Sequence, residues 1–313
     1  MASKIRKGQL KRFKILMQPQ YPLYIPSKGR YEKRLTSDFL TEINVPHYIV
    51  IEKQEFDLYN SYVKKNKLVT LLILDKKYQD NYETLDDLGD SKSKGPGAAR
   101  NFVWQHSIDN GFSWHWVMDD NISCFYRANK NKQIKVTNGA IFKAMEDFCL
   151  RYENLYMAGP NYHMFQVAKQ KRPPFVPNTR IYSCNFIRND ISYRWRGRYN
   201  EDTILSLDIL KDGFCTVQFN AFLQGKVRTS VLRGGNSGEF YDKEGTLPKS
   251  KMLADVYPEY AKIKWRFSRI HHYVDYTSFK KNKLIKKSNY KRDNIKEINN
   301  YGMELKKINN GQK

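Results

Sequence analysis

The sequence predicts an α/β domain in which helices flank a mostly parallel sheet. Short, almost continuously apolar runs recur along the middle of the chain, and longer segments with helical periodicity separate them. Strands that are buried on both faces of a parallel sheet have this uninterrupted apolar character. Polar residues directly follow several of the runs, and ligands of such sheets bind beyond the carboxyl ends of the strands. We therefore expect the functional site at that edge of the sheet.

The first part of the chain contains four predicted strands and one long helix. The strands are the apolar runs at residues 21–30, 47–53, 68–75 and 113–120, the first of which ends in a Pro-Ser-Lys-Gly turn. A polar loop ending in Gly-Pro-Gly follows the third strand and leads into the helix. Pro96 suits the first turn of this helix, and Gly111 suits its C-terminal stop.

Helices and strands continue to alternate in the second part. A helix is predicted over residues 138–152, because apolar side chains recur on one face of it. These side chains belong to Ile141, Met145, Phe148 and Cys149. The remaining elements are strands at residues 155–160, 180–188 and 215–222 and a helix from Asn200 to Leu210 that ends near Gly213.

Basic residues outnumber acidic ones, and the excess is concentrated at the two ends. Lys plus Arg is 55 against 32 Asp plus Glu, a formal net charge of +23. Residues 1–14 carry six basic side chains and no acidic one, and residues 280–313 carry eleven basic and three acidic ones. We predict a basic arm (1–18), a folded domain (19–278) and a basic tail (279–313). Such ends most often contact nucleic acid, although a solvated tail has the same composition.

The composition gives no indication of a membrane or of an oxidising compartment. The longest apolar runs, such as Val69 to Leu74, are too short to span a bilayer, and no apolar signal segment follows the basic N-terminus. The four cysteines lie far apart and form no Cys-x-x-Cys pair, so neither a zinc site nor a disulfide framework is suggested. We expect reduced thiols, a cytoplasmic location and no membrane contact.

Polar residues after the strands are suited to bind a nucleotide diphosphate. Carboxylates can accept hydrogen bonds from ribose or base, while Lys and Arg can bind the phosphates. The candidates are Pro26, Ser27, Lys28 and Arg30 after the first strand, Glu52 after the second, Gly95, Arg100 and Asn101 around the start of the long helix, and Asp120 after the fourth strand. Each motif alone is also typical of an ordinary turn or loop.

The triplet Asp119-Asp120-Asn121 follows an apolar strand and is the candidate metal site. Asp119 and Asn121 are two residues apart, so on an extended strand end they point the same way. Mg²⁺ or Mn²⁺ needs only one or two carboxylates besides phosphate oxygens and waters. His272, in the late motif IHHYVDY, could reach back to the same metal. The alternative is a cap or turn built from Asp and Asn, with a structural histidine.

A second acidic motif, WRGRYNED, leads into the helix that begins near Asn200. Glu201 and Asp202 occupy its first turn, where acidic residues are common for dipole reasons alone. The functional interpretation is that one of these carboxylates acts as general base for a reacting hydroxyl. Trp195 and Gly197 favour it, because an aromatic side chain beside a flexible joint could form a wall of a substrate pocket.

In this order, the motifs resemble those of nucleotide-sugar-dependent glycosyltransferases of the GT-A fold, which is Rossmann-like. The matching segments are IPSKGR, Glu52, GAARN, the Asp119-Asp120-Asn121 strand and WRGRYNED, within about residues 21–276. With LRGGNSG and HHYVDY, they look closer still to phage glycosyltransferases associated with TET/JBP-type pyrimidine oxygenases. That family is thought to glycosylate hydroxymethylated pyrimidines in DNA. One departure is Asn121, where the GT-A metal motif has Asp, so a neutral ligand or a water-mediated contact is implied.

The resemblance implies an enzyme that moves a sugar from a UDP-sugar to the hydroxymethyl group of a 5-hydroxymethylpyrimidine in DNA, with inversion. A phage enzyme of this kind would work in the host cytoplasm. Asp202 would be the base, with Glu201 as the runner-up. The other implied contacts are Glu52 to the uridine, Lys28, Arg30 and Arg100 to the ribose-phosphate, and Mg²⁺ or Mn²⁺ to Asp119, Asn121 and His272. On the acceptor side are Arg194, Trp195, Arg196 and Arg198 and a backbone nest of Gly234, Gly235 and Asn236, which could instead face the donor phosphates.

Two other functions fit the same residues. One is a GT-A glycosyltransferase that acts on a protein or glycan acceptor and uses its basic ends to bind an anionic polymer. The other is a non-catalytic nucleic-acid-binding module on a decayed transferase fold. Transfer to hydroxymethylated DNA and binding of a nucleotide-sugar separate the three.

Overall fold

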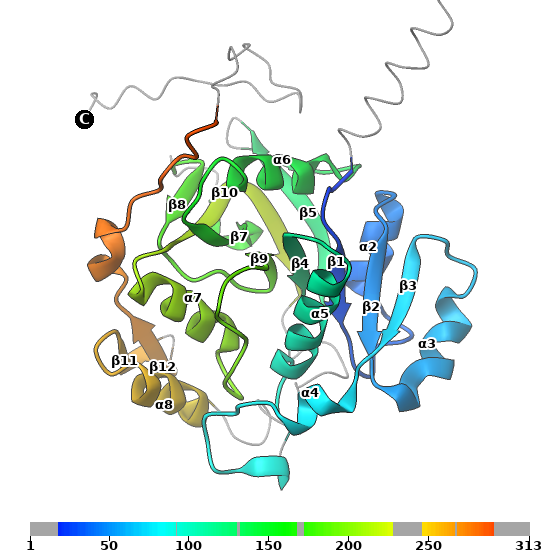
Figure 1. Cartoon of the computed structure of the whole chain (residues 1–313), viewed down its shortest axis with the longest axis horizontal. Helices are drawn as coiled ribbons and strands as arrows, with labels where there is room; N and C mark the ends of the chain where they lie inside the picture. The colour runs from blue at the N-terminus through cyan, green and yellow to red at the C-terminus, as the bar shows by residue number, and fades with distance from the viewer. Residues whose placement is uncertain are drawn as a thin grey trace, which may run out of the picture.

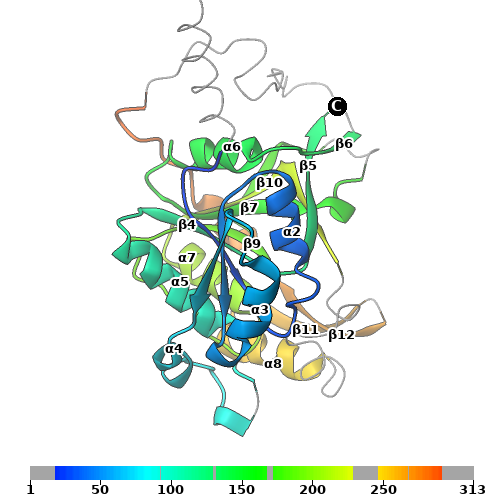
Figure 2. The same cartoon turned by 90° about the vertical axis from the view of Figure 1, so that its right-hand side faces the viewer.

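A ten-stranded mixed sheet runs through the centre of the described chain and carries helices on both faces (Figures 1 and 2). The computed structural model describes residues 18–91, 93–129, 132–167, 172–227, 246–266 and 268–290. The strand order is β3-β2-β1-β4-β9-β7-β10-β5-β6, and β8 pairs with β10 from outside this path. The strands are β1 (Leu23–Pro26), β2 (His47–Ile51), β3 (Val69–Ile73), β4 (Trp114–Met118), β5 (Ile122–Asn129), β6 (Lys132–Lys135), β7 (Leu155–Tyr162), β8 (Phe175–Pro177), β9 (Cys184–Arg188) and β10 (Cys215–Lys226).

A separate two-stranded hairpin and several helices surround this sheet. The hairpin strands are β11 (Ala261–Arg266) and β12 (Arg269–Val274). The α-helices are α2 (Leu35–Glu42), α3 (Phe56–Val63), α4 (Lys76–Asp80), α5 (Gly97–Asp109), α6 (Ala140–Cys149), α7 (Glu201–Lys211) and α8 (Leu247–Val256). Short 3-10 helices are η1 (Lys53–Glu55), η2 (Gly89–Ser91), η3 (His163–Phe165) and η6 (Thr277–Lys281). Among the described helices, none has the length and apolar character needed to cross a membrane.

Most strands of the sheet run in one direction. β1 pairs in parallel with β2 and β4, β2 with β3, and β7 with β10, whereas β9 lies antiparallel between β4 and β7. The carboxyl ends of the parallel strands therefore meet at one edge, at the lower end of the molecule in Figure 1. This arrangement confirms the predicted α/β class with a mostly parallel sheet, to which β5 and β8 add antiparallel strands beside β10.

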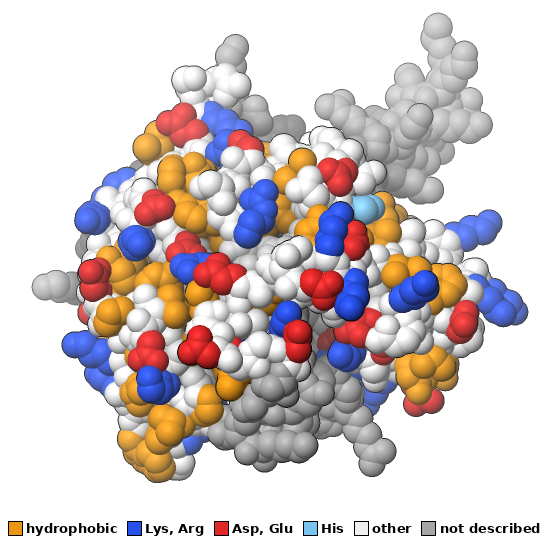
Figure 3. Space-filling model, turned by 60° about the horizontal axis from the view of Figure 1, so that its bottom comes forward, with side chains coloured by type: hydrophobic (Ala, Val, Ile, Leu, Met, Phe, Trp, Pro, Cys, Tyr) orange, Lys and Arg blue, Asp and Glu red, His pale blue; other side chains and the backbone are white. Residues whose placement is uncertain are grey.

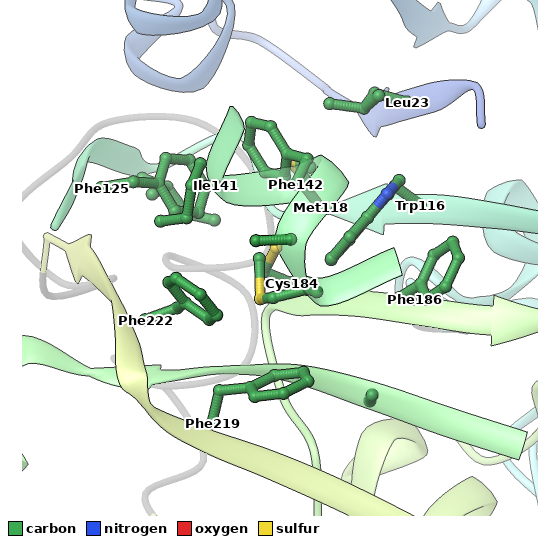
Figure 4. Packing of buried hydrophobic residues seen from close by; sticks show 14 of the residues in the cluster. Leu23, Trp116, Met118, Phe125, Ile141, Phe142, Cys184, Phe186, Phe219 and Phe222 are labelled. Carbon is green, nitrogen blue, oxygen red and sulfur yellow. The ribbon is translucent and has the colours of Figure 1, made fainter. Parts of the chain in front are cut away.

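The central strands are apolar throughout because alternate residues face two different helical layers. In β4, Trp114, Trp116 and Met118 belong to a cluster that includes residues of α2 and α6. The intervening Val117 packs with residues of α5 and α7 on the opposite face. Figure 4 shows the first cluster, in which the Trp116 and Phe186 rings stack at a centroid distance of 4.6 Å. With both faces covered, the sheet can hold strand ends in fixed positions.

Every element predicted from the apolar pattern is present, with bounds that differ by a few residues. The strand expected at 180–188 begins only at Cys184, because Ser183 takes a left-handed φ of 65°. The sequence did not indicate α2, α3, α8 or the strands β5, β6 and β8. Helices α2 and α3 have eight residues each and no side-chain hydrogen bond at the N-cap, so they lack the usual start signal.

The packed chain extends beyond the predicted domain boundary at residue 278. Phe279 is buried in the cluster formed by α7 and α8, and the Asn178 amide donates to the carbonyls of Phe279 and Asn282. A β-bridge joins Lys286 to Tyr152. The boundaries themselves stay a prediction, because residues 1–17 and 291–313, most of the expected basic arm and tail, lie outside the described residues.

Glu146 is a buried carboxylate on α6 that connects the sheet to the segment before β1. Its oxygens accept hydrogen bonds from the backbone N–H groups of Gln20 and Tyr21 at 2.7 and 3.3 Å. The indole N–H of Trp116 donates to it at 2.9 Å. Burial raises the pKa of Glu146 to about 7, although the three N–H donors act in the opposite direction.

We expect Glu146→Gln to flatten the pH dependence of stability. The carboxyl keeps its proton to higher pH in the folded protein than in the unfolded chain, so its contribution to stability falls as the pH rises from about 4.5 to about 7. This shift corresponds to roughly 3 kcal/mol over that interval. Urea unfolding of both proteins across this range should show the decline in the wild type and a weaker one in the variant. Equal pH slopes would contradict the assignment.

Candidate active site

A cavity of about 770 Å³ lies at the carboxyl ends of the strands and is bordered by α7, α8 and β12. Figure 3 shows this end of the molecule, where acidic and basic side chains lie side by side. Of the residues predicted from the sequence, those that line the cavity are Pro26, Ser27, Lys28, Arg30, Glu52, Gly95, Arg100, Asp119, Asp120, Asn121, Arg198, Glu201, Asp202 and His272. The motifs that are distant in sequence therefore converge on one space.

Arg100, in the first turn of α5, binds three carboxylates at once. Its guanidinium donates to Asp119 at 2.8 Å and to Asp202 at 2.6 Å, and it lies 3.2 Å from a Glu201 oxygen. The Arg100 side chain is only 3% exposed, and its guanidinium stacks on the Trp195 ring at 4.6 Å. Burial lowers the pKa of Arg100, but the three carboxylates outweigh burial and raise it, so the guanidinium stays charged.

Asn101 fixes the segment that carries the candidate bases. Its side-chain amide donates to the Trp195 carbonyl at 2.8 Å, and the Trp195 backbone N–H donates to the Asn101 side-chain oxygen at 2.9 Å. An amide that pairs in both directions with one backbone residue holds that residue in place. Asn101 was predicted as a nucleotide contact, but it does not line the cavity. In the structure it joins the GAARN helix to the WRGRYNED segment.

Two glycines of these motifs meet at Tyr82. A Cβ on Gly97 would lie 1.9 Å from the Tyr82 hydroxyl oxygen, and this hydroxyl donates to the Gly197 carbonyl at 2.9 Å. Gly197 itself has a φ of 91°, in the left-handed region that favours glycine. The close approach of α5 to the WRGRYNED segment therefore requires glycine on both sides of Tyr82.

Lys226, the last residue of β10, is a cavity cation that the sequence did not indicate. Its ammonium donates to Asp119 at 2.5 Å and to the Ser183 hydroxyl at 2.7 Å. Burial disfavours the charged form of Asp119, yet Lys226 and Arg100 together lower the pKa of Asp119 to about 2. Burial also works against the charge of Lys226, and Asp119 outweighs it, so the pKa of Lys226 rises. Asp119 is therefore a carboxylate held between two cations.

Asp120 is held by the loop that follows β1. The Ser27 hydroxyl donates to Asp120 at 2.8 Å, and the Arg30 guanidinium forms a buried ion pair with it. The Tyr59 hydroxyl lies 2.8 Å from the Ser27 oxygen and accepts from the Arg30 backbone N–H at 3.1 Å. Burial raises the pKa of Asp120, while Arg30 lowers it. The predicted Ser-Lys-Gly-Arg turn is thus locked onto the strand that ends in the acidic triplet.

Glu52 lies at the rim of the cavity, after β2. Its carboxylate is 3.1 Å from the Lys28 ammonium and accepts from the Gln79 side-chain amide at 3.2 Å. The Glu52 side chain is 20% exposed and that of Lys28 is 54% exposed. Both side chains can therefore exchange their present contacts for a ligand at the mouth of the cavity.

The predicted metal ligands offer a mixed set of donor atoms. Asn121 donates through its amide to the Val227 carbonyl at 3.2 Å, and its side-chain oxygen has no hydrogen-bond partner among the described residues. The Nε2 atom of His272 is likewise buried and without a partner there. Burial, with help from nearby cations, lowers the pKa of His272 to about 3, so its imidazole is neutral at pH 7. The carboxylate and amide oxygens suit Mg²⁺ or Mn²⁺, whereas the imidazole is a ligand that a transition metal such as Mn²⁺ accepts more readily than Mg²⁺ does.

No cluster of three or more His, Cys, Asp or Glu side chains suited to a metal occurs within the described segments. This observation does not include amides such as that of Asn121. Both oxygens of Asp119 are already engaged by Arg100 and Lys226. A metal at Asp119 would therefore share the carboxylate with at least one of these cations.

Of the residues predicted on the acceptor side, Trp195 and Arg198 are buried, Arg196 is partly buried and Arg194 is exposed. Arg196 and Arg198 each pair with an aspartate, at 2.9 and 2.7 Å, and the Arg198 side chain is 0% exposed. Arg194 stacks over a tryptophan ring at 4.8 Å, and Trp195 is buried beneath Arg100. Of these four only Arg198 lines the cavity, and their role as DNA contacts stays a prediction. The predicted nest of Gly234, Gly235 and Asn236 lies outside the described residues.

A family model described as TET-Associated Glycosyltransferase matches residues 21–235. No curated protein matches the chain. The matched range covers more than half of the chain and includes β1 to β10 and α7, but it ends before α8 and the β11–β12 hairpin. The match confirms the resemblance that the motifs predicted.

We expect Arg100→Met to destabilise the protein in a pH-dependent way. Without the guanidinium, Asp119, Glu201 and Asp202 lose their shared counter-charge, which should cost about 3–5 kcal/mol near neutral pH. The loss should be smaller near pH 5, because repelling carboxylates can take up protons. Arg194→Met is the matched control, since Arg194 also stacks on a tryptophan but bonds to backbone carbonyls. The measurement is the free energy of unfolding in urea at both pH values. A loss that is independent of pH and no larger than that of Arg194→Met would contradict the prediction.

Proposed function

The chain belongs to the TET-associated glycosyltransferase family, and on this premise we propose that it transfers a sugar from a UDP-sugar to the hydroxymethyl group of a 5-hydroxymethylpyrimidine in DNA, with inversion. One observation carries this proposal. A single buried guanidinium, that of Arg100, binds both the candidate base Asp202 and the acidic strand end at Asp119. Two nitrogens of one side chain therefore bind the proposed proton acceptor and the strand end at which we place the charged leaving group.

The donor lies across the strand ends. A cavity of about 770 Å³ falls within the range of about 300–1,000 Å³ that is common for small-molecule sites. Glu52 at the rim accepts hydrogen bonds from the uridine, and Lys28 beside it lies near the ribose-phosphate. Asp120 keeps the Ser27–Arg30 loop in position through its contacts with both residues. The sugar then lies in the part of the cavity that Asp119 and Asp202 line.

Transfer is a direct displacement at the anomeric carbon. The acceptor hydroxyl oxygen forms a bond to this carbon from the face opposite the diphosphate, and the bond between the carbon and the diphosphate oxygen breaks. The diphosphate leaves with the electron pair, and the hydroxyl proton passes to Asp202. The Ser183 backbone N–H and the Asn185 amide, each at 3.3 Å, hold Asp202 in the cavity wall together with Arg100. Among the described residues Glu201 receives no comparable pair of donors, so Asp202 is the better positioned of the two for the role of base.

The protein's own cations lie where negative charge accumulates. Arg100 and Lys226 both bind Asp119, and both line the cavity in which a departing diphosphate would develop its charge. Asp119, Asn121 and His272 would hold Mg²⁺ or Mn²⁺, which neutralises the charge of a leaving diphosphate when it is bound. The acceptor is a polyanion, which agrees with a formal net charge of +23.

We expect Asp202→Asn to lower transfer about 100- to 10,000-fold, as removal of a general base does. UDP binding should persist, because the amide keeps the shape of the side chain. Asp109→Asn, at the other end of α5, is the matched control and should transfer normally. The measurement is mass spectrometry of nucleosides from hydroxymethylated and unmodified DNA, treated with a panel of UDP-sugars.

The same experiment separates the other functions. If no donor gives transfer to hydroxymethylated DNA, yet UDP-sugar is hydrolysed or a protein or glycan is labelled, the DNA acceptor is wrong. If DNA binds but UDP does not, the chain is a binding module rather than an enzyme. Full activity of Asp202→Asn and Glu201→Gln would refute the assigned base and its runner-up.

We expect UDP binding to depend on Mn²⁺ through Asn121 and His272. The rise in melting temperature caused by UDP should grow when Mn²⁺ is added to the wild type, and EDTA should abolish that increment. Asn121→Ala and His272→Ala should lose it, whereas His163→Ala, outside the cavity lining, should keep it. If the UDP-induced rise in melting temperature is the same with Mn²⁺ and with EDTA, the metal proposal is wrong. Arg100 and Lys226 would then be the cations that neutralise the diphosphate.

A further inference from the structure

The β11–β12 hairpin extends from α8 beside the cavity and carries only positive charge. Figures 1 and 2 both place it next to α8 at the lower end of the molecule. Residues 261–274 contain Lys262, Lys264, Arg266 and Arg269 and no acidic residue. All four basic residues are exposed. The hairpin is thus a local concentration of positive charge at the edge of the proposed active site.

The pairing register sorts the hairpin into two faces. Lys262 pairs with Tyr273, Lys264 with His271, and Arg266 with Arg269, so these side chains share one face. On that face the Lys264 ammonium lies 4.4 Å and the Arg266 guanidinium 5.5 Å from the centre of the Tyr273 ring. The result is a ladder of cations supported by one aromatic ring, with the spacing of alternate strand residues. Arg269 and His271 of this face also line the cavity. Such a ladder suits a polyanionic backbone.

The opposite face is buried at the base of the hairpin and becomes exposed toward Trp265. Ala261 and Val274, at the base of the hairpin, pack into the cluster of α7 and α8. The next residue on this face of β12, His272, is buried and lines the cavity, and Ile270 beyond it also lines the cavity. Trp265, the partner of Ile270, comes last and is 72% exposed. One face therefore leads from the core, past the cavity, to an exposed indole.

Trp265 is unlike the other tryptophans of the chain. All five lie in the described part, and Trp104, Trp114, Trp116 and Trp195 are each at most 3% exposed. A large aromatic side chain placed in water beside a cavity, with cations on the reverse face, has the composition of a nucleic-acid contact. Single-strand and base-flipping proteins combine aromatic stacking with basic grooves in this way.

We propose that the β11–β12 hairpin is the DNA-docking element, with Trp265 stacked on a base next to the target nucleotide and the ladder of Lys262, Lys264, Arg266 and Arg269 against the phosphates. The inference rests on the proposed DNA acceptor. It deepens that proposal by naming the surface that presents the target base to the cavity. This surface lies outside the range matched by the family model.

Because the Trp265 indole is exposed, tryptophan fluorescence can test whether it contacts DNA. The full chain is titrated, without donor, with a hydroxymethylated duplex while tryptophan emission is recorded. We expect DNA to quench the wild type and to leave Trp265→Ala nearly unquenched, because the other four tryptophans are buried. Anisotropy of a labelled duplex should show binding weakened roughly tenfold or more in Trp265→Ala and partly restored in Trp265→Phe.

The cation ladder has a separate readout. The salt dependence of binding should be reduced by about two phosphate contacts in Lys264→Ser/Arg266→Ser. The control is Lys64→Ser/Lys65→Ser, two exposed lysines at the end of α3, which lies far from the hairpin in Figure 1. Its salt dependence should match that of the wild type. Thermal melting and the UDP-induced shift show that each variant is folded and keeps its donor site.

The outcomes distinguish this inference from the proposed function. If Trp265→Ala binds DNA as tightly as the wild type and is quenched equally, the hairpin assignment is overturned, whatever the transfer assay shows. Equal salt dependence of the ladder variant and its control would overturn the phosphate contacts. If the hairpin variants lose DNA binding while the wild type transfers no sugar to DNA, the docking surface stands and the proposed reaction fails.

Discussion

The shared binding of three carboxylates by Arg100 is the interaction on which the site depends. Asp119 comes from the end of β4, and Glu201 and Asp202 come from the start of α7, so one guanidinium ties a strand end to a helix end. Three acidic side chains cannot stay ionised in one buried space without such a counter-charge. Arginine suits this position because its planar fork offers several donors and its face can stack on Trp195. The position of the proposed base thus follows from the electrostatics of the strand end.

The acidic triplet shows how one strand end serves two purposes. Asp119 faces Arg100 and Lys226, whereas Asp120, the next residue, faces Ser27 and Arg30 of the first loop. The chain leaves β4 at Met118 and turns at Asp120 and Asn121 before β5, so the two carboxylates can take different directions. Asp120 contributes chiefly to the shape of the Ser27–Arg30 loop, while Asp119 contributes charge to the cavity.

The sequence predicted the elements whose signals are local. The long helix behind Pro96 and the apolar strands before Glu52 and Asp119 follow from neighbouring residues, and the structure confirms them. Lys226 and Ser183 could not be found in this way, because Lys226 meets Asp119 across 107 residues and one lysine in a basic chain carries no signal. The pattern also could not tell that Arg198 is buried, since a surface arginine and one paired with an aspartate look alike in sequence.

The contacts that join α5 to the WRGRYNED segment have a consequence for evolution and engineering. Asn101 pairs with the Trp195 backbone, Tyr82 lies between Gly97 and Gly197, and so neither segment can change shape alone. Substitutions on the two sides should be epistatic, with costs that are far from additive. A chimaera that takes only one of the two segments from a relative would bring together contact surfaces that do not fit each other. The two segments are best exchanged as a single cassette.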